Sequence, residues 1–220
     1  MADGRVMYEE PREGSRETGD VRLNAYEIRR LLAEHAGVKP PFAIREQNGN
    51  PYVGARGYGF KDGENAYLIV VSDRYEDLKA NLLHVTGASA RHVYNVRDRQ
   101  YLGETDRAAI ALSPGRPAML AFLPYKMRKV TLTARAGPSR VIKFKLQAKA
   151  SSKMGRNVFH VMLLDRDGRE VPELSRNLTG VDGQAAGSLQ LPLNAPAGIY
   201  LLRALDVASG LSGETQVNFR

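Results

Sequence analysis

The sequence contains no cysteine and no tryptophan among its 220 residues. Without cysteine, a disulfide framework and thiolate ligation of a metal are both excluded, and with them the class of small disulfide-stapled secreted scaffolds. The redox state of the compartment is left open. Without tryptophan, any aromatic binding platform has to be built from the ten tyrosines and six phenylalanines.

Long apolar runs are also missing. No run approaches the roughly 20 residues that a membrane-spanning helix needs, and residues 1–20 (MADGRVMYEEPREGSRETGD) lack the apolar core of a signal peptide. We expect the chain as given to be soluble and to have no membrane partner. Its localisation stays unknown, because a signal upstream in a longer, secreted or periplasmic parent is compatible with this sequence.

Charge is unbalanced towards the positive sign, with 32 basic against 24 acidic residues and a net charge of +8. Such an excess raises the question of nucleic acid. The densest basic clusters, at residues 126–129 and 140–149, lie in strand-like alternation without the interleaved aromatic residues that stack on bases. We therefore expect a solvated basic face of a β-sandwich and no nucleic-acid partner.

Motifs that carry chemistry are absent. The four histidines (His35, His84, His92 and His160) have no metal-ligand spacing, and no nucleophile elbow or phosphate-binding loop occurs. The segment GARGYG at 54–59 lacks the final glycine of a dinucleotide fingerprint. Three carboxylate groups occur at turns, and one of them, DRDG at 165–168, echoes a calcium loop without its bidentate glutamate. We predict no catalytic residue, no cofactor and no metal site.

One helix is predicted near the N-terminus. Asn24 and Glu27 form a capping-box pair, apolar residues follow at helical spacing, Gly37 suits the left-handed C-terminal position, and Pro40-Pro41 prevents continuation. This helix should pack one face against a sheet.

From Phe42 onward apolar residues recur at every second position, which indicates β-strands. Turn signals at Asn48-Gly49 and Asp62-Gly63 divide the first of them. Further strands are predicted at residues 67–71, 80–86, 91–96, 108–113 and 118–124. We place a domain boundary near residue 126, because a fresh strand begins at Val130.

The last part of the chain alternates most clearly. Strands are predicted at residues 129–134, 140–148, 157–164, 187–193, 199–206 and 214–219, with turns at Asp167-Gly168 and Asp182-Gly183. About seven short strands in roughly 95 residues, with no helix between them, predict an immunoglobulin-like sandwich. The fold class is therefore mainly β: residues 1–41 hold one helix, residues 42–126 form a first β-sandwich module and residues 127–220 form the immunoglobulin-like one.

Tyrosines supply the remaining candidates for a site. Tyr200 follows the turn segment NAPAG at 194–198, so it is either a tyrosine corner or an ordinary strand residue, and both interpretations stay open. Exposed tyrosine rings can stack on sugars, although most tyrosines belong to cores or strand edges. The candidate carbohydrate contacts are Tyr52, Tyr58, Tyr75 and Tyr101.

Four short runs share a recognisable pattern: HVYNVR at 92–97, YLGETD at 101–106, LSPG at 112–115 and AFLPY at 121–125. They resemble the β-sandwich regions that lie C-terminal to the catalytic part of large bacterial glycoside-hydrolase-like proteins, in the neighbourhood of β-galactosidases. PAGIY at 196–200 and DVASG at 206–210 resemble the terminal immunoglobulin-like domain of such proteins. GRVMY at 4–8 and AGVKPP at 36–41 resemble the end of the α/β domain that precedes the sandwich. Asn95 stands where the pattern usually has Asp.

The resemblance implies a function without chemistry in this chain. The matched positions are turn glycines, prolines, a tyrosine and apolar strand residues, and in this family the catalytic carboxylates lie in a barrel domain that the chain lacks. We expect a non-catalytic accessory region of a carbohydrate-active enzyme, whose partners are the catalytic domain of the larger protein and, as a second candidate, polysaccharide. An independent carbohydrate- or cell-surface-binding module is the alternative. A small enzyme that brings carboxylates together by folding is the third hypothesis.

Overall fold

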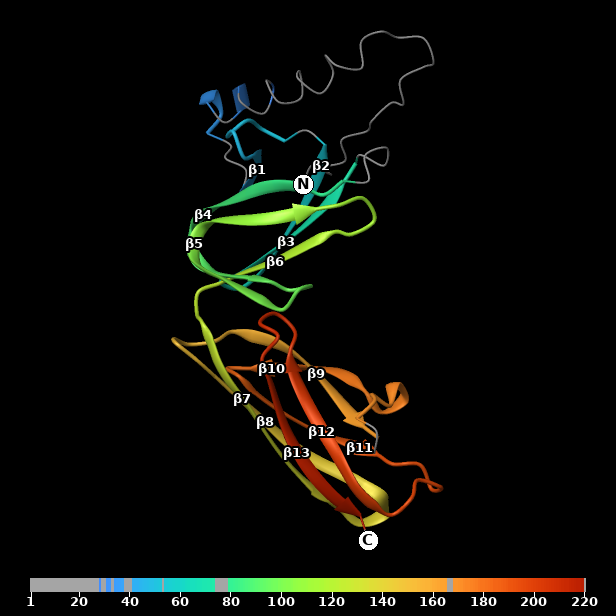
Figure 1. Cartoon of the computed structure of the whole chain (residues 1–220). Coiled ribbons are helices and arrows are strands. Elements are labelled where there is room, and N and C mark those ends of the chain that lie inside the picture. Colours follow the sequence, from blue (N-terminus) through green and yellow to red (C-terminus); the bar gives the residue numbers. More distant parts are fainter. Residues whose placement is uncertain are drawn as a thin grey trace.

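The computed structural model describes residues 28, 31–32, 34–37, 41–52, 54–73, 79–165 and 168–219. It is mainly β, and its strands form two sheets that follow each other along the molecule (Figure 1). We call the strands up to residue 123 the first unit and those from residue 127 the second unit. The predicted fold class is confirmed in this respect.

The first unit is a six-stranded sheet. Its strands run in the order β1-β4-β6-β3-β2, with β5 paired to β4. Buried apolar side chains such as Leu68, Val85 and Leu120 form its core. The strands are β1 (Phe42–Glu46), β2 (Ala55–Asp62), β3 (Asn65–Ser72), β4 (Asn81–Asn95), β5 (Gln100–Leu112) and β6 (Ala118–Leu123).

Strand β4 corrects the prediction of two strands at 80–86 and 91–96. The small residues between Thr86 and Arg91 suggest a break, but the backbone stays extended there and only the register with β5 shifts. The first half of β4 pairs with β1, and residues His92 to Asn95 pair with β6. One strand thus connects two parts of the sheet.

The second unit has the arrangement of an immunoglobulin-like sandwich. Its strand order is β13-β12-β9-β10-β11-β8-β7, and β10 and β11 share only the register Val181↔Gln184 at their hairpin. This seven-stranded sheet therefore folds over at that point, and its two parts, β10-β9-β12-β13 and β7-β8-β11, which we treat below as the two sheets of the sandwich, enclose one core. The strands are β7 (Met127–Ala136), β8 (Val141–Ala150), β9 (Arg156–Leu164), β10 (Arg176–Val181), β11 (Gln184–Gln190), β12 (Gly198–Asp206) and β13 (Ser212–Phe219), with 3-10 turns η1 (Pro138–Arg140) and η2 (Pro172–Leu174).

Six of these seven strands overlap predicted ones, whereas β10 was missed. Its sequence RNLTGV offers only scattered apolar residues and no clean alternation. The turn that follows it was predicted correctly: Asp182 and Gly183 both have positive φ, which a two-residue hairpin of this kind requires.

The N-terminal predictions fall mostly outside the described residues. Ile28, Leu31, Leu32, Glu34 and His35 are helical, and the first three are exposed. The full helix, its packing on a sheet and the assignment of residues 1–41 to a preceding domain stay predictions, as does the domain boundary itself. None of the helices in the described part of the chain has the length and apolarity to cross a bilayer.

Candidate functional site at the junction of the two units

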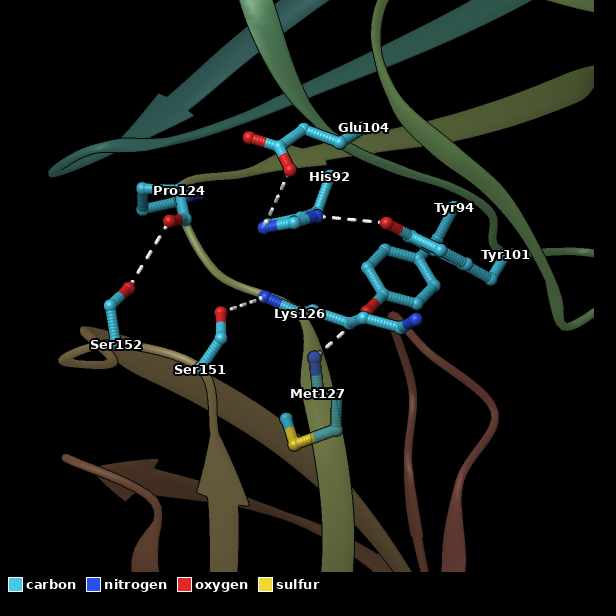
Figure 2. A network of polar contacts seen from close by, with 9 residues as sticks. All are labelled: His92, Tyr94, Tyr101, Glu104, Pro124, Lys126, Met127, Ser151 and Ser152. Carbon is cyan, nitrogen blue, oxygen red and sulfur yellow. Dashed lines mark hydrogen bonds and ion pairs between the residues drawn. The ribbon is translucent and has the colours of Figure 1, made fainter.

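The segment between the units, residues 124–126, is hydrogen-bonded on both sides (Figure 2). The Met127 backbone N–H donates to the Tyr94 hydroxyl at 2.8 Å, inside the protein. On the other side, the Lys126 N–H donates to Ser151 Oγ at 2.8 Å, and Ser152 Oγ donates to the Pro124 carbonyl at 3.2 Å. The connection is therefore a fixed element rather than a free linker.

Aromatic and charged side chains surround the same segment (Figure 2). The rings of Tyr94 and Tyr101 pack at a centroid distance of 5.0 Å, and Lys126 Nζ lies 4.6 Å from the centroid of the Tyr101 ring. His92 Nδ1 lies 2.8 Å from the Tyr101 hydroxyl, and its Nε2 lies 4.0 Å from a Glu104 oxygen. Burial raises the pKa of Tyr101, so its hydroxyl stays neutral and available for hydrogen bonding.

A buried polar cluster lies behind the linker. Asn157 Nδ2 donates to the Tyr125 hydroxyl at 3.0 Å and to Asp206 Oδ1 at 3.4 Å. Ser209 donates twice to Asp206 Oδ2, from its backbone N at 2.8 Å and from Oγ at 2.6 Å. Burial raises the pKa of Asp206, and the bonds from Ser209 and Asn157 oppose that rise. Burial also raises the pKa of the Tyr125 hydroxyl. Asp206 thus closes the turn between β12 and β13 and anchors it beneath the linker.

The turn between β2 and β3 makes a second contact with the second unit. Asn65 Nδ2 donates to the Arg156 carbonyl at 3.0 Å, and Arg156 Nε donates to Asp62 Oδ1 at 3.0 Å. Sequence patterns do not reveal these residues, because the partners are 91 and 94 positions apart and neither end carries a motif.

A third contact joins the β4–β5 loop to the turn between β12 and β13. Gly210 has φ +76°, and a Cβ built on it would lie 2.5 Å from the Cβ of Arg99. Glycine is therefore required at this position both by its backbone conformation and by the close approach of the other unit.

Of the predicted carbohydrate contacts, the three that the structure describes lie in different surroundings. Tyr52 is 8% exposed and belongs to the core of the first unit, whereas Tyr58 on β2 is 48% exposed. Tyr101 is half-buried in the junction. Tyr75 lies outside the described residues, and sugar binding by any of the four stays a prediction.

An apolar pocket of 290 Å³ lies at the junction. Phe60 from β2 is 55% exposed, and Met119 and Val158 at the same pocket are also exposed. Tyr67 and Asn157 are the residues with polar side chains in its lining, which is made up of Phe60, Tyr67, Leu68, Ile69, Val96, Met119, Leu120, Asn157, Val158, Val207 and Ala208. Such a lining fits apolar side chains, because a sugar needs several polar partners for its hydroxyl groups.

The tyrosine corner is present. The Tyr200 hydroxyl donates to the Pro196 carbonyl at 2.7 Å, and its ring meets Phe219 edge-on at 6.1 Å. Of the two interpretations of Tyr200, the structure shows the corner.

The predicted acids and histidines are placed as follows. His160 lies 2.8 Å from Asn177 Oδ1 and 3.1 Å from Glu170 Oε1, and Asp165 accepts the Arg169 N–H within its turn. A hydrogen bond from Ser175, followed by one from His160, lowers the pKa of Glu170. Among the described residues one carboxylate, Asp206, is buried, and no three His, Cys, Asp or Glu side chains gather as a metal site. Glu76, Asp77 and Asp167 lie outside the described residues.

Comparisons with known proteins give the following. No family model matches the chain, and no curated protein matches it either. Solved structures with some likeness include the chicken interferon gamma receptor alpha chain, at 9% identity and a TM-score of 0.32, covering 74% of this chain and 96% of that one. Two structures of the Ruminococcus gnavus beta-glucuronidase show 10% and 9% identity and TM-scores of 0.27 and 0.28, covering 83% and 87% of this chain but only 44% and 43% of theirs. At these TM-scores the likeness carries no argument about activity.

Proposed function

We propose that this chain is a non-catalytic accessory β-sandwich region of a carbohydrate-active enzyme, and that it holds two β units at a fixed angle beside the catalytic domain. The observation that carries the proposal is where the recognisable motifs lie. Tyr94 and Tyr101 of the first unit, Tyr125 of the linker and Asp206 and Gly210 of the second unit all meet at the junction. These five motif residues therefore serve one structural purpose, which is to fix the two units to each other.

The apolar pocket supports the choice of partner. Exposed apolar side chains such as Phe60, Met119 and Val158 lie close together over two units, and burying them against another protein surface is favourable. In this proposal the pocket receives apolar side chains of the catalytic domain. A fixed angle between the units keeps both walls of the pocket in place.

Two measurements test the accessory role. The purified chain should hydrolyse none of a panel of chromogenic α- and β-glycosides, and turnover that a single point mutation abolishes would contradict the proposal. Reading the DNA upstream of the codon for Met1 is the second test. We expect an in-frame stretch that encodes a catalytic barrel, and a reading frame without one would also contradict the proposal.

An independent carbohydrate- or cell-surface-binding module is the second candidate. It is favoured by Tyr58 and Phe60, which are both exposed and stand two residues apart on β2, so that their side chains leave the same face. Affinity electrophoresis across a glycan panel discriminates the two functions. Retardation by a neutral glycan that Tyr58→Ala abolishes would favour this candidate, and no retardation on any glycan would exclude it.

A further inference from the structure

A basic face covers the outside of the sheet β7-β8-β11. Along β8 the side chains alternate strictly, with Ile142, Phe144 and Leu146 buried and Lys143, Lys145 and Lys149 exposed. Strand β7 adds exposed cations beside them. We call this set, Lys129, Arg135, Lys143, Lys145 and Lys149, the basic face.

The cations of the basic face are neighbours. Arg135 is directly opposite Lys143 in the register, and Lys129 is directly opposite Lys149. Like charges opposite each other across two strands are destabilising. The repulsion within these two pairs therefore lowers the stability of the folded chain, and a bound anionic partner would remove that repulsion.

Counter-charges are missing from this sheet. Strands β7, β8 and β11 contain no Asp and no Glu. In the part of the chain that the structure describes, none of the five side chains makes an ion pair. On the opposite sheet, by contrast, Arg203 on β12 is paired with Glu214 on β13, and Arg156 on β9 is paired with Asp62 of the first unit. The positive potential is thus concentrated on one side of the second unit.

The basic face is hollowed. A groove of 570 Å³ is lined by the cations Arg135, Lys143 and Lys145, by the hydroxyl residues Thr133 and Ser188, and by Ala134, Phe144, Ala186 and Gly187. Charged donors for anions and hydroxyl groups for neutral hydrogen bonds therefore stand side by side. Outward side chains repeat at about 6.5–7 Å along each strand and about 5 Å between strands, so an extended polymer meets several of them at once.

Polysaccharide fits this face better than nucleic acid. Single-stranded nucleic acid is held by aromatic side chains that stack on its bases, but Phe144, the aromatic residue of these three strands, is buried. The face is a sheet surface with a shallow groove, and it presents no helix or ribbon to enter a groove of duplex DNA. Anions spaced along a hydroxyl-rich chain match both kinds of group in the groove.

We propose that the basic face binds an anionic polysaccharide, one that carries sulfate or carboxylate groups along its length. This site is separate from the junction and does not rest on the accessory role proposed above. The loss of either proposal leaves the other standing, because one depends on β7, β8 and β11 and the other on the contacts around residues 124–126.

The test measures binding of the full chain to dextran sulfate and polygalacturonate, with unmodified dextran as the neutral probe, at several salt concentrations. The variant is Arg135→Gln with Lys143→Gln and Lys145→Gln. Its matched control is Lys61→Gln with Arg107→Gln and Arg176→Gln, which removes three exposed cations from other strands. Both variants have the same net charge, so they separate a local site from overall charge. Circular dichroism checks that both fold.

We expect binding to at least one anionic probe and none to dextran, at least a tenfold loss in the basic-face variant, and less than a twofold loss in the control. The dependence of affinity on salt should also become shallower in the basic-face variant, because fewer counterions are released. Equal losses in the two variants, or no binding to either anionic probe at physiological salt, would overturn the proposal. Tighter binding to single-stranded or duplex DNA than to both polysaccharides, through the same three side chains, would overturn the choice of polysaccharide.

Discussion

Asn95 illustrates how single residues are explained by their neighbours. It stands where the resembling pattern has Asp, and here its Nδ2 donates to Asp98 Oδ2 at 2.8 Å. Asp98 is also paired with Arg116, at 2.7 Å. An Asp at position 95 would place two carboxylates in contact, so the amide suits the loop that this sequence has. The sequence alone showed the departure from the pattern but not the partner that accounts for it.

Tyr94→Phe tests the buried hydrogen bond of the linker. The substitution leaves the Met127 N–H without its acceptor in the interior, which should lower the free energy of unfolding by about 1–3 kcal/mol. Tyr200→Phe is the matched control, because it also removes one hydroxyl that bonds to backbone, but at an exposed site. Urea titration of the three proteins should show the larger loss for Tyr94→Phe. Equal losses would contradict a special role for this bond.

Asp206→Asn tests the buried carboxylate by its pH dependence. Burial raises the folded-state pKa of Asp206 above the unfolded value of about 3.9. The favourable contribution of its protonated form is therefore complete below pH 4 and is lost as pH rises through the folded pKa. Relative to the Asn variant, the natural chain should lose free energy of unfolding between pH 4 and that folded pKa. Urea titrations from pH 3.5 to 7 measure the free energy of unfolding of the natural chain minus that of the Asn variant. This value should fall as pH rises, and a rise would contradict the assignment.

At the scale of elements, alternation predicted most strands of the second unit because one side of each strand faces a core. Strand β8 is the clearest case, with every second residue buried. Strand β10 was missed because Arg, Asn, Thr and Gly fill most of its six positions. Strand β4 was divided because small residues such as Gly87 look like a break, although one strand continues through them with a shift in its register with β5. Local patterns therefore identify strands that bury every second residue, and they fail where a strand contains a bulge or few apolar residues.

Gly210→Ala tests the contact between the β4–β5 loop and the turn between β12 and β13. The new methyl group would meet Arg99 at 2.5 Å, in addition to the strain of a positive φ. Gly168→Ala is a close control, because Gly168 has the same φ of +76° with nothing within 4 Å. Strain alone should cost about 1–2 kcal/mol of unfolding free energy. Thermal and urea unfolding should give a clearly larger loss for Gly210→Ala, whereas matching losses would show that the two units are not pressed together there.

At the scale of the whole molecule, the sequence predicted two β units and their order but not how they meet. Asn65 and Arg156, or Arg99 and Gly210, are brought together only once both units have folded, and no periodicity links positions so far apart. The motif residues Tyr94, Tyr125 and Asp206 all lie at the junction, although the sequence alone did not predict a junction there. The sequence was less informative about sugar contacts. Whether a tyrosine side chain is exposed depends on how the strands pack, and the residue type alone does not determine this.

The central claim is that the junction holds the two units at one fixed angle. The absence of native cysteine allows two spin labels to be placed cleanly, one at Arg107→Cys on β5 and one at Gln216→Cys on β13, both exposed positions. A second pair of labels, at Lys145→Cys and Gln216→Cys, lies entirely in the second unit. The width of its distance distribution gives the contribution of the labels themselves. Pulsed dipolar spectroscopy should find a single distance distribution across the junction, as narrow as the one within the second unit. A broad or multi-peaked distribution across the junction, with a narrow one within the unit, would contradict the claim.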